Sequence, residues 1–331
     1  MIEQQADTVI VGGGLVGAAL ALALGRGQAA APRRRIVLVE SADIRPGDPS
    51  HIPSSPSFDT RATALAESSV ASFRRLGVWE SMANVAAPIT HVHVSELGRW
   101  GATRLEAREM GRTEFGHVVL NSGIGQALLQ GLARSPGVEV WSPATVRQLQ
   151  PIAGGMRVIF DGARQAITAP LVVLADGGRS PLMAALGLEV TRLPYGQVAV
   201  IANLEPTLAA DGRAFERFTG DGAMAILPLC AHQGRPRVAL VWTRPAALAE
   251  ATLALDDAAF LAAVESCFGQ RLGPLRWAGS RVVYPLERNL AREQARPGLV
   301  VLGNAAHTLH PVAGQGFNLS LRDAMALAAH L

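Results

Sequence analysis

Lysine is absent from this chain of 331 residues, and all 30 of its basic residues are arginine. That absence excludes chemistry that needs a lysine amine, such as a Walker-type phosphate loop, a pyridoxal Schiff base or a lysine general base. Charged residues make up only 17% of the chain and the formal net charge is +3, so nucleic-acid binding is not indicated. A hydrophobic content of 49% excludes a disordered chain and predicts a large core, at a length that fits roughly two domains.

Cysteine is also scarce, which excludes a disulfide scaffold. The two cysteines, Cys230 and Cys267, lie in apolar surroundings, and we interpret them as buried thiols of a reducing compartment. His91 and His93 would share one face of a strand, but no third ligand is apparent in the sequence. No metal site is therefore predicted.

One stretch without charge, residues 8–25, meets the lower length limit for a membrane span. Glu3 and Asp7 precede it, however, where a signal peptide would carry positive charge. Three consecutive glycines, at residues 12–14, interrupt the stretch where a spanning helix would need side chains. A strand, a tight turn and a buried helix explain the segment better, and we expect a soluble protein.

A βαβ unit begins almost at the first residue. Residues 9–11 suit a strand buried on both faces, residues 15–24 an alanine- and leucine-rich helix, and residues 36–39 a second strand. The turn between the first strand and the helix is Gly-Gly-Gly-Leu-Val-Gly, at residues 12–17, which has the GxGxxG spacing. This combination predicts a Rossmann-type dinucleotide site.

Each polar or glycine position of that unit has a physical role in such a site. Gly12 permits the turn, Gly14 lets backbone N–H groups approach a pyrophosphate, and Gly17 packs the helix on the strand. The N-terminus of the helix adds partial positive charge for the phosphates. Glu40, at the end of the second strand, can accept both ribose hydroxyls of an adenosine. The motif alone does not choose between NAD and FAD.

Two later segments have the shape of a short buried strand that ends in small and polar residues. Residues 171–174 are followed by Ala-Asp-Gly, which includes Asp176, and residues 299–302 are followed by Gly303 and Asn304. In an open parallel sheet, ligands bind at the carboxyl ends of the strands. We therefore expect these two strand ends and the first glycine turn to converge on one ligand.

The remaining organisation is less regular. Residues 185–285 show short alternating runs broken by proline and glycine, which predict a mostly antiparallel sheet, covered by a helix near residues 256–268. Asp59 or Thr60 is expected to cap a helix that ends at Gly77.

The three strand ends resemble the fingerprints of the FAD-dependent aromatic hydroxylases, the 4-hydroxybenzoate hydroxylase-like flavoprotein monooxygenases. Their second fingerprint is matched by Ala-Asp-Gly-Gly-Arg-Ser at residues 175–180, and their third by the segment 303–318. The resemblance implies an α/β fold, with a Rossmann-type FAD-binding domain and a second, mostly antiparallel substrate domain. The implied FAD-binding segments are residues 1–85, 113–184 and 286–331, and the implied substrate-domain segments are residues 86–112 and 185–285.

Within that superfamily, the chain is similar to the UbiH-type hydroxylases of ubiquinone biosynthesis, the 2-polyprenyl-6-methoxyphenol hydroxylase branch. Asn304 stands where aspartate is usual, and Thr-Leu-His-Pro and Ala-Gly-Gln-Gly-Phe-Asn-Leu follow it; residues 59–61 and 116–128 carry the same resemblance. The resemblance implies that a polyprenylated phenol is hydroxylated with O₂ through a flavin C4a-hydroperoxide. FAD would be the resident cofactor, and NAD(P)H or another electron donor a transient reductant, since no second GxGxxG follows a strand.

The resemblance also implies a set of site residues. The expected FAD contacts are Gly12, Gly14, Gly17, Glu40, Arg61, Asn121, Gln126, Asp176, Gly303, Asn304, Gly316, Phe317 and Asn318. Arg61, Asn121 and Gln126 could equally be ordinary helix-surface or capping residues. Asp176 could bond either backbone or ribose. Residues 316–318 open a helix whose free N–H groups and dipole can point at the flavin ring.

Two neighbouring residues are candidates for the catalytic machinery. His310 is the candidate base for the phenol proton, and the alternative is a histidine that bonds the backbone of its loop. Pro311 and the apolar residues 225–229 are candidates for a wall that excludes water.

The expected partners are a hydrophobic prenylated phenol and O₂, with no nucleic acid. A ubiquinone-biosynthesis complex, a cytoplasmic location and peripheral contact with the inner membrane are further expectations. Because relatives continue through several more helices, we expect C-terminal helices to be missing and the apolar stripe that includes Phe317, Leu321 and Ala324 to be exposed. Two alternatives stay open: another flavin oxidoreductase of this fold, such as a prenyl reductase or halogenase, and a truncated non-catalytic subunit.

Overall fold

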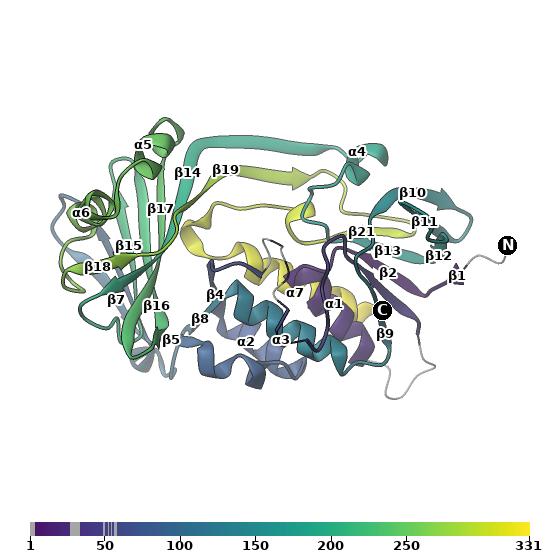
Figure 1. Ribbon diagram of the computed structural model, residues 1–331, viewed down its shortest axis with the longest axis horizontal. Coiled ribbons are helices and arrows are strands. Elements are labelled where there is room, and N and C mark those ends of the chain that lie inside the picture. Colours follow the sequence, from purple (N-terminus) through teal and green to yellow (C-terminus); the bar gives the residue numbers. More distant parts are fainter. Residues whose placement is uncertain (1–3, 27–33, 49, 52, 54, 56–57) are drawn as a thin grey trace.

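The computed structural model describes residues 4–26, 34–48 and 50–331, apart from residues 52, 54, 56 and 57. It has two bodies, an α/β body that contains both ends of the chain and a β-rich body (Figure 1). Two long strands, β14 (Val190–Pro206) and β19 (Val282–Ala291), run across both bodies and pair with each other in antiparallel fashion.

A six-stranded sheet forms the centre of the α/β body. Its order is β20 (Ala295–Arg296), β21 (Leu299–Val301), β13 (Leu171–Leu174), β2 (Thr8–Val11), β3 (Ile36–Val39) and β9 (Val138–Trp141). All neighbours pair in parallel except β20, which is an antiparallel edge. The βαβ unit expected at the N-terminus is confirmed.

Both faces of this sheet are covered, which explains why its strands are apolar throughout. On one face, Ile10 and Leu38 pack against α1 (Leu15–Arg26), α3 (Asn121–Ala133) and α7 (Gly316–His330). On the other face, Val9 and Val37 pack against a four-stranded sheet and α4 (Leu182–Ala185). That second sheet has the order β1 (Gln4–Gln5), β12 (Ile167–Ala169), β11 (Gly155–Phe160), β10 (Val146–Ile152).

An eight-stranded sheet forms the β-rich body. Its order is β18 (Leu275–Ala278), β14, β17 (Arg235–Pro245), β16 (Gly222–His232), β15 (Arg213–Thr219), β6 (His91–Glu96) and β7 (Ala102–Glu106), and β19 also pairs with β14. Every pair is antiparallel except β15 with β6. The helix α6 (Asp257–Phe268), capped by Asp256, and the short helix α5 (Ala249–Leu253) lie on one face. The mostly antiparallel sheet and the helix near residues 256–268 are therefore confirmed.

A three-stranded sheet, with the order β4 (Ala62–Ala66), β8 (Gly116–Leu120), β5 (Ala87–Ile89), lies between the two bodies. The expectation that Asp59 or Thr60 caps a helix is wrong. Residues 62–66 pair with β8 instead, and the helix α2 (Glu67–Arg75) begins only at Glu67, with no side-chain cap. Pairing with a distant strand overrides the local helical pattern at this point. Short 3₁₀ turns occupy Trp79–Ser81, Ala83–Val85, Ala107–Met110, Ala246–Leu248, Gly303–Ala305 and Pro311–Ala313.

The structure corrects two further expectations about burial. Leu321 and Ala324 on α7 are fully buried against α1, and the ring of Phe317 stacks on that of Phe73 at 6.2 Å, so this stripe is not exposed. Cys230 and Cys267 are free thiols as expected, but they are half-buried rather than fully buried.

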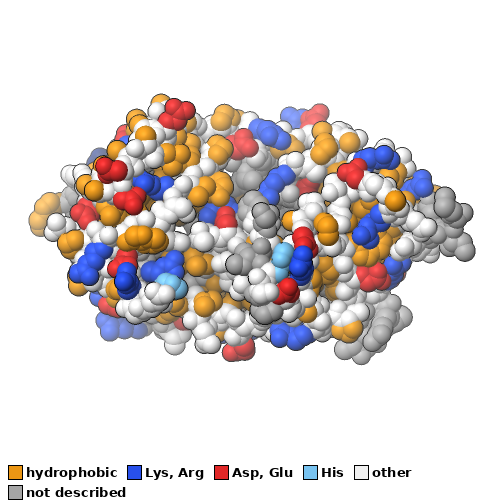
Figure 2. Space-filling view, viewed as in Figure 1, with side chains coloured by type: hydrophobic (Ala, Val, Ile, Leu, Met, Phe, Trp, Pro, Cys, Tyr) orange, Lys and Arg blue, Asp and Glu red, His pale blue; other side chains and the backbone are white. Residues whose placement is uncertain are grey.

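The surface and the helices add two observations. Over the face drawn in Figure 2, arginines and acidic side chains are interspersed rather than gathered by sign. Among the described residues, no helix combines the length and the hydropathy that crossing a bilayer requires.

Candidate functional site

Three loops meet at the carboxyl edge of the six-stranded sheet, where β2, β13 and β21 end side by side. Gly12 has a φ of +109°, and a Cβ at this position would lie 2.5 Å from the carbonyl oxygen of Ala175. A Cβ at Gly178 would lie 3.6 Å from the carbonyl oxygen of Asn304. The first loop therefore touches the second, and the second touches the third. The expected convergence of the three strand ends is confirmed.

The first loop is bound to the end of β3 through Glu40. The Glu40 carboxylate accepts hydrogen bonds from the backbone N–H of Gly13 at 2.7 Å and from that of Ala42 at 2.9 Å. Gly13 was not among the predicted site residues, yet a Cβ there would lie 2.8 Å from that of Glu40. A Cβ at Gly17 would lie 1.9 Å from the carbonyl oxygen of Gly12, which explains the close packing of α1 on this turn. Three consecutive glycines were the signal that could have identified Gly13.

The second loop is held by Asp176. One oxygen of its carboxylate accepts from the backbone N–H of Gly178 at 2.9 Å, and the other accepts from the hydroxyl of Ser180. Of the two predicted alternatives for Asp176, the structure shows the bond to backbone. Its carboxylate thus fixes the turn that carries Gly178 towards the third loop.

The third loop begins at Gly303, whose φ of +65° lets the chain turn next to Val16 on α1. Asn304 is exposed, so its amide is available to a ligand. His307 places its Nε2 at 3.1 Å from the carboxylate of Asp323, which attaches this loop to α7. The third loop is therefore in contact with α1 through Gly303 and with α7 through His307.

At the N-terminus of α7, the backbone N–H groups of the first turn are open to a ligand. No atom lies within 4 Å of where a Cβ at Gly316 would be, and Gln315 provides no side-chain cap. The first N–H groups of a helix have no intrahelical partners. The side chain of Asn318, by contrast, is fully occupied: it accepts from Ala66 N and Ser69 Oγ and donates to the carbonyl oxygens of residues 64 and 314. Only the backbone at this position remains for a ligand.

His310 lies in the loop before α7, directly ahead of Pro311. Its Nδ1 accepts from the backbone N–H of Val312 at 3.3 Å, which places the ring proton on Nε2, 3.2 Å from Oε1 of Gln197. Its ring packs edge-on against Tyr195, and burial lowers the pKa of His310. This geometry matches the alternative of a histidine that bonds loop backbone. A role for His310 as a base stays a prediction.

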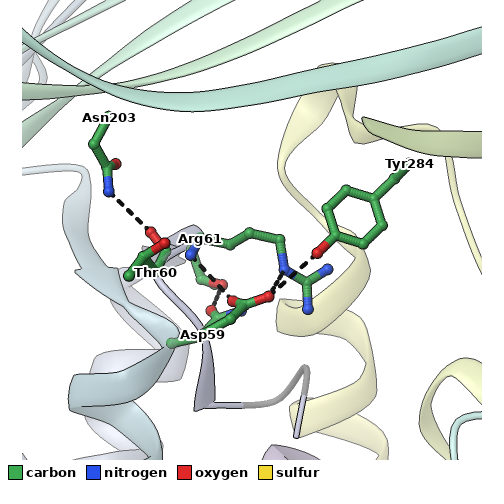
Figure 3. A network of polar contacts seen from close by, with 7 residues as sticks. Asp59, Thr60, Arg61, Asn203 and Tyr284 are labelled. Atoms are coloured by element: carbon green, nitrogen blue, oxygen red, sulfur yellow. Dashed lines mark hydrogen bonds and ion pairs between the residues drawn. The ribbon is translucent and has the colours of Figure 1, made fainter. Parts of the chain in front are cut away.

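A polar network joins the loop of residues 59–61 to strands β14 and β19 (Figure 3). Arg61 donates through Nε to Asp59 at 2.6 Å and lies over the ring of Tyr284, whose hydroxyl donates to the same carboxylate at 3.3 Å. Asn203 on β14 donates to the carbonyl oxygen of Thr60 at 3.2 Å. The loop of residues 59–61 therefore contacts both β14, through Asn203, and β19, through Tyr284. Sequence reasoning missed Tyr284, which carries no local motif.

Asn121 and Gln126 lie on α3 below this network. The buried Asn121 donates to Asp59 at 3.3 Å and accepts from the Thr63 hydroxyl at 2.7 Å, so it orients the loop that carries Arg61. Gln126 is half-buried on the same helix. The roles predicted for these three residues towards FAD stay predictions.

These parts fit the groups that a flavin dinucleotide presents. Glu40 offers a carboxylate for ribose hydroxyls, and the N-terminus of α1 offers N–H groups for phosphate. The open N-terminus of α7 offers N–H groups for negative charge on the flavin ring. A family model described as the FAD binding domain matches residues 5–331.

The chain belongs to this family.

Two of its relatives are named as hydroxylases. It is 34% identical over 330 residues to the ubiquinone hydroxylase UbiL of Rhodospirillum rubrum, across 99% of this chain and 73% of the relative. It is 32% identical over 333 residues to the 3-demethoxyubiquinol 3-hydroxylase of Escherichia coli, across 99% and 80%. The predicted cofactor, FAD, and the predicted class, an FAD-dependent monooxygenase, are confirmed.

Solved structures show the same fold. PqsL of Pseudomonas aeruginosa in complex with 2-aminobenzoylacetate superimposes with a TM-score of 0.79 at 20% identity, covering 98% of this chain and 86% of that one. The myxobacterial halogenase CndH gives 0.75 at 18% identity, covering 99% and 76%. The predicted fold is confirmed. Because a halogenase shares it, the fold alone does not choose the reaction.

Proposed function

We propose that this family member hydroxylates the ring of a polyprenylated phenol in ubiquinone biosynthesis. The ring C–H, O₂, NAD(P)H and one proton become C–OH, water and NAD(P)⁺, and bound FAD supplies the activation of O₂. The observation that carries the proposal is the alignment of 99% of the chain with two hydroxylases, one named for ubiquinone and one for demethoxyubiquinol.

The protein's own contribution begins with holding FAD. We assign the ribose to Glu40 and the pyrophosphate to the backbone at Gly14 and the first turn of α1. Asn304, exposed at the third loop, would bind by neutral hydrogen bonds where relatives use aspartate. The backbone of residues 316–318 would face the flavin ring.

The second contribution is an apolar wall. Leu227 and Leu229 on β16 pack with Ala62 and Ala64 of β4, on the face of the eight-stranded sheet that is turned towards the FAD-binding body. The residues of this cluster are apolar, so the wall suits a ring that bears alkyl and methoxy groups. Pro311, at the start of its 3₁₀ turn, is assigned to the same exclusion of water.

A prenylated substrate is stored in lipid, and the hairpin between β6 and β7 has the chemistry of a membrane contact. Trp100 at its tip is fully exposed, and exposed Leu97 donates its N–H to the carbonyl oxygen of exposed Phe218. Tryptophan favours the interface between membrane and water, and Arg99 beside it can meet anionic headgroups. We infer that this tip makes the peripheral membrane contact. Membership of a ubiquinone-biosynthesis complex and a cytoplasmic location stay predictions.

Product analysis under ¹⁸O₂ tests the reaction. The purified flavoprotein, NAD(P)H and 2-prenyl-6-methoxyphenol, an analogue with one isoprenoid unit, are expected to yield a ring hydroxyl that contains one ¹⁸O atom. A product with two added hydrogens indicates a prenyl reductase, and a halogenated product formed with added chloride indicates a halogenase. If only hydrogen peroxide forms with an authentic long-chain phenol as well, the proposed hydroxylation is wrong.

A further inference from the structure

Glu216 is a carboxyl group that neither the FAD site nor any structural ion pair uses. It lies on β15, one residue after Phe215, whose ring packs against Phe268 of α6. Because neighbouring residues of a strand point to opposite faces, Glu216 lies on the face turned away from α6. The register supports this: Phe215 is opposite buried Ile226, and Glu216 is opposite Ala225.

That face is the one that the FAD-binding body covers. Glu216, Ala225, Val241 and Ile201 form one row across four adjacent strands. The next residue of β14 on that face is Asn203, which bonds to Thr60 of the loop in Figure 3. The residue before Glu216 on that face of β15, Ala214, packs with Ile89 and Val118 of the three-stranded sheet. Glu216 therefore lies in the space between the two bodies, on the wall assigned above to the substrate.

The surroundings of Glu216 are apolar. Its direct neighbours across the sheet are Val94 and Ala225, and among the described residues its carboxyl has no hydrogen bond or ion pair. Burial raises the pKa of Glu216 to about 7. The charged or titratable groups on this face and on the loop packed against it are few, and they are Glu96 with its partner Arg99, Glu205 with its partner Arg235, Arg237, Tyr284 and the Asp59–Arg61 pair.

We propose that the carboxylate of Glu216 accepts the proton of the substrate's phenol hydroxyl. The O–H bond breaks, the proton forms a neutral carboxylic acid on Glu216, and the electron pair stays on the phenol oxygen, where it enriches the ring for attack on oxygen. The inference rests on the proposed function, since it needs a phenol in the site. It names a residue that the sequence pattern did not single out.

The chemistry of proton transfer supports this choice. A phenol has a pKa near 10, so a carboxylate with an ordinary pKa near 4.3 is a poor base for it. A desolvated carboxylate that titrates near neutral pH is a much better match, because a general base works best when its pKa lies near the working pH. His310, the base predicted from the sequence, has both ring nitrogens engaged by Val312 and Gln197. Glu216 has both oxygens available in the described structure.

The experiment compares wild type, Glu216→Gln and a matched control, Glu96→Gln, which removes a paired carboxylate from the same face of the adjacent strand. Each holoenzyme is titrated with 2-prenyl-6-methoxyphenol without reductant, and the Kd of the phenol is followed against pH. We expect wild type and Glu96→Gln to bind the phenol more tightly above about pH 7, where the ionised Glu216 accepts a hydrogen bond from its hydroxyl, and Glu216→Gln to lose this pH dependence. Turnover of Glu216→Gln is expected to fall about 100-fold or more, with KM changed far less, and with normal flavin content.

Two results would overturn the proposal. One is a Glu216→Gln variant whose Kd for the phenol depends on pH as that of wild type does, and the other is a variant whose kcat stays within about threefold of wild type across the pH range. A wild-type enzyme whose binding of the phenol depends on Glu216 in this way but which forms no hydroxylated product would support the contact between Glu216 and the phenol and refute the proposed hydroxylation. A Glu216→Asp variant whose kcat still falls at low pH, as that of wild type does, would support the assignment further.

Discussion

The α-carbon of Gly12 faces the carbonyl oxygen of Ala175 so closely that no side chain fits between them. We predict that Gly12→Ala costs at least ~2 kcal/mol of stability and abolishes FAD retention, because a Cβ would collide at 2.5 Å and the residue would be strained at a φ of +109°. Thermal unfolding and the visible flavin spectrum measure both effects. The matched control is Gly101→Ala, which has a φ of +100° with no atom within 4 Å. Equal losses in the two variants would mean that strain alone, and not the contact between loops, matters.

Glu40 is predicted to support both the glycine turn and the adenosine. Glu40→Ala removes an acceptor from the N–H groups of Gly13 and Ala42, and bonds to a charged group contribute about 1.5–3 kcal/mol. We therefore expect the apparent Kd for FAD to rise about tenfold or more, as measured by quenching of flavin fluorescence. Glu80→Ala, at an exposed position, should leave the Kd unchanged. An unchanged Kd in Glu40→Ala would remove Glu40 from the site.

Asn318 is predicted to matter through structure rather than through its side chain's contact with flavin. Asn318→Asp replaces the amide donor to the carbonyl oxygens of Ala64 and Gly314 with a carboxylate oxygen. We expect a loss of about 2–4 kcal/mol and a lower Tm even in protein stripped of FAD. Asn84→Asp is the surface control. A Tm that falls only when FAD is present would contradict this assignment and favour a direct contact.

The pKa of Glu216 predicts an unusual dependence of stability on pH. Because burial raises that pKa from 4.5 to about 7, the folded protein holds a proton between these values that the unfolded chain has lost, so this group's contribution falls as pH rises through that window. Glu216→Gln cannot ionise, so it is expected to be more stable than wild type by about 1–2 kcal/mol above pH 7, allowing for partial exposure, and equally stable below about pH 4.5. Denaturant unfolding at several pH values checks this. A destabilised variant at pH 8 would show that the carboxylate has a structural partner.

The membrane contact has its own test. Trp100→Ala is expected to reduce sedimentation with vesicles of anionic phospholipid severalfold, because it removes the exposed aromatic side chain at the tip of the β6–β7 hairpin. Trp277→Ala, which removes an exposed tryptophan from β18 at the other side of the same sheet, serves as the control. If both variants sediment equally, the hairpin is not the contact.

The elements predicted well from sequence are those whose signals are local. The strands at residues 9–11 and 36–39 and the GxGxxG turn carry their information within a few residues, and both the fold and the meeting of three loops follow from them. Residues 62–66 were misjudged because their strand state depends on β8, more than 50 residues away in sequence. Local pattern does not contain that pairing.

Residues of the candidate site also differ in how far the local sequence predicts their roles. Glu40 could be placed from the end of its strand, whereas the four hydrogen bonds of Asn318 go mostly to residues about 250 positions earlier in the chain. Glu216 stands in a sequence that resembles an ordinary surface strand, and its burial arises only from the register of four strands. Properties that depend on such long-range registers need the structure.

The ribbon formed by β14 and β19 has a break in its register between Pro194 and Gln197. Tyr195, whose ring packs on His310, lies inside this break, and Gln197, which bonds that histidine, borders it. A break of this kind bends the strand that contains it, so the ribbon between the two bodies changes direction here. The position of the bend therefore also fixes the position of His310, and with it the loop that contains Pro311, against the strand that links the two bodies.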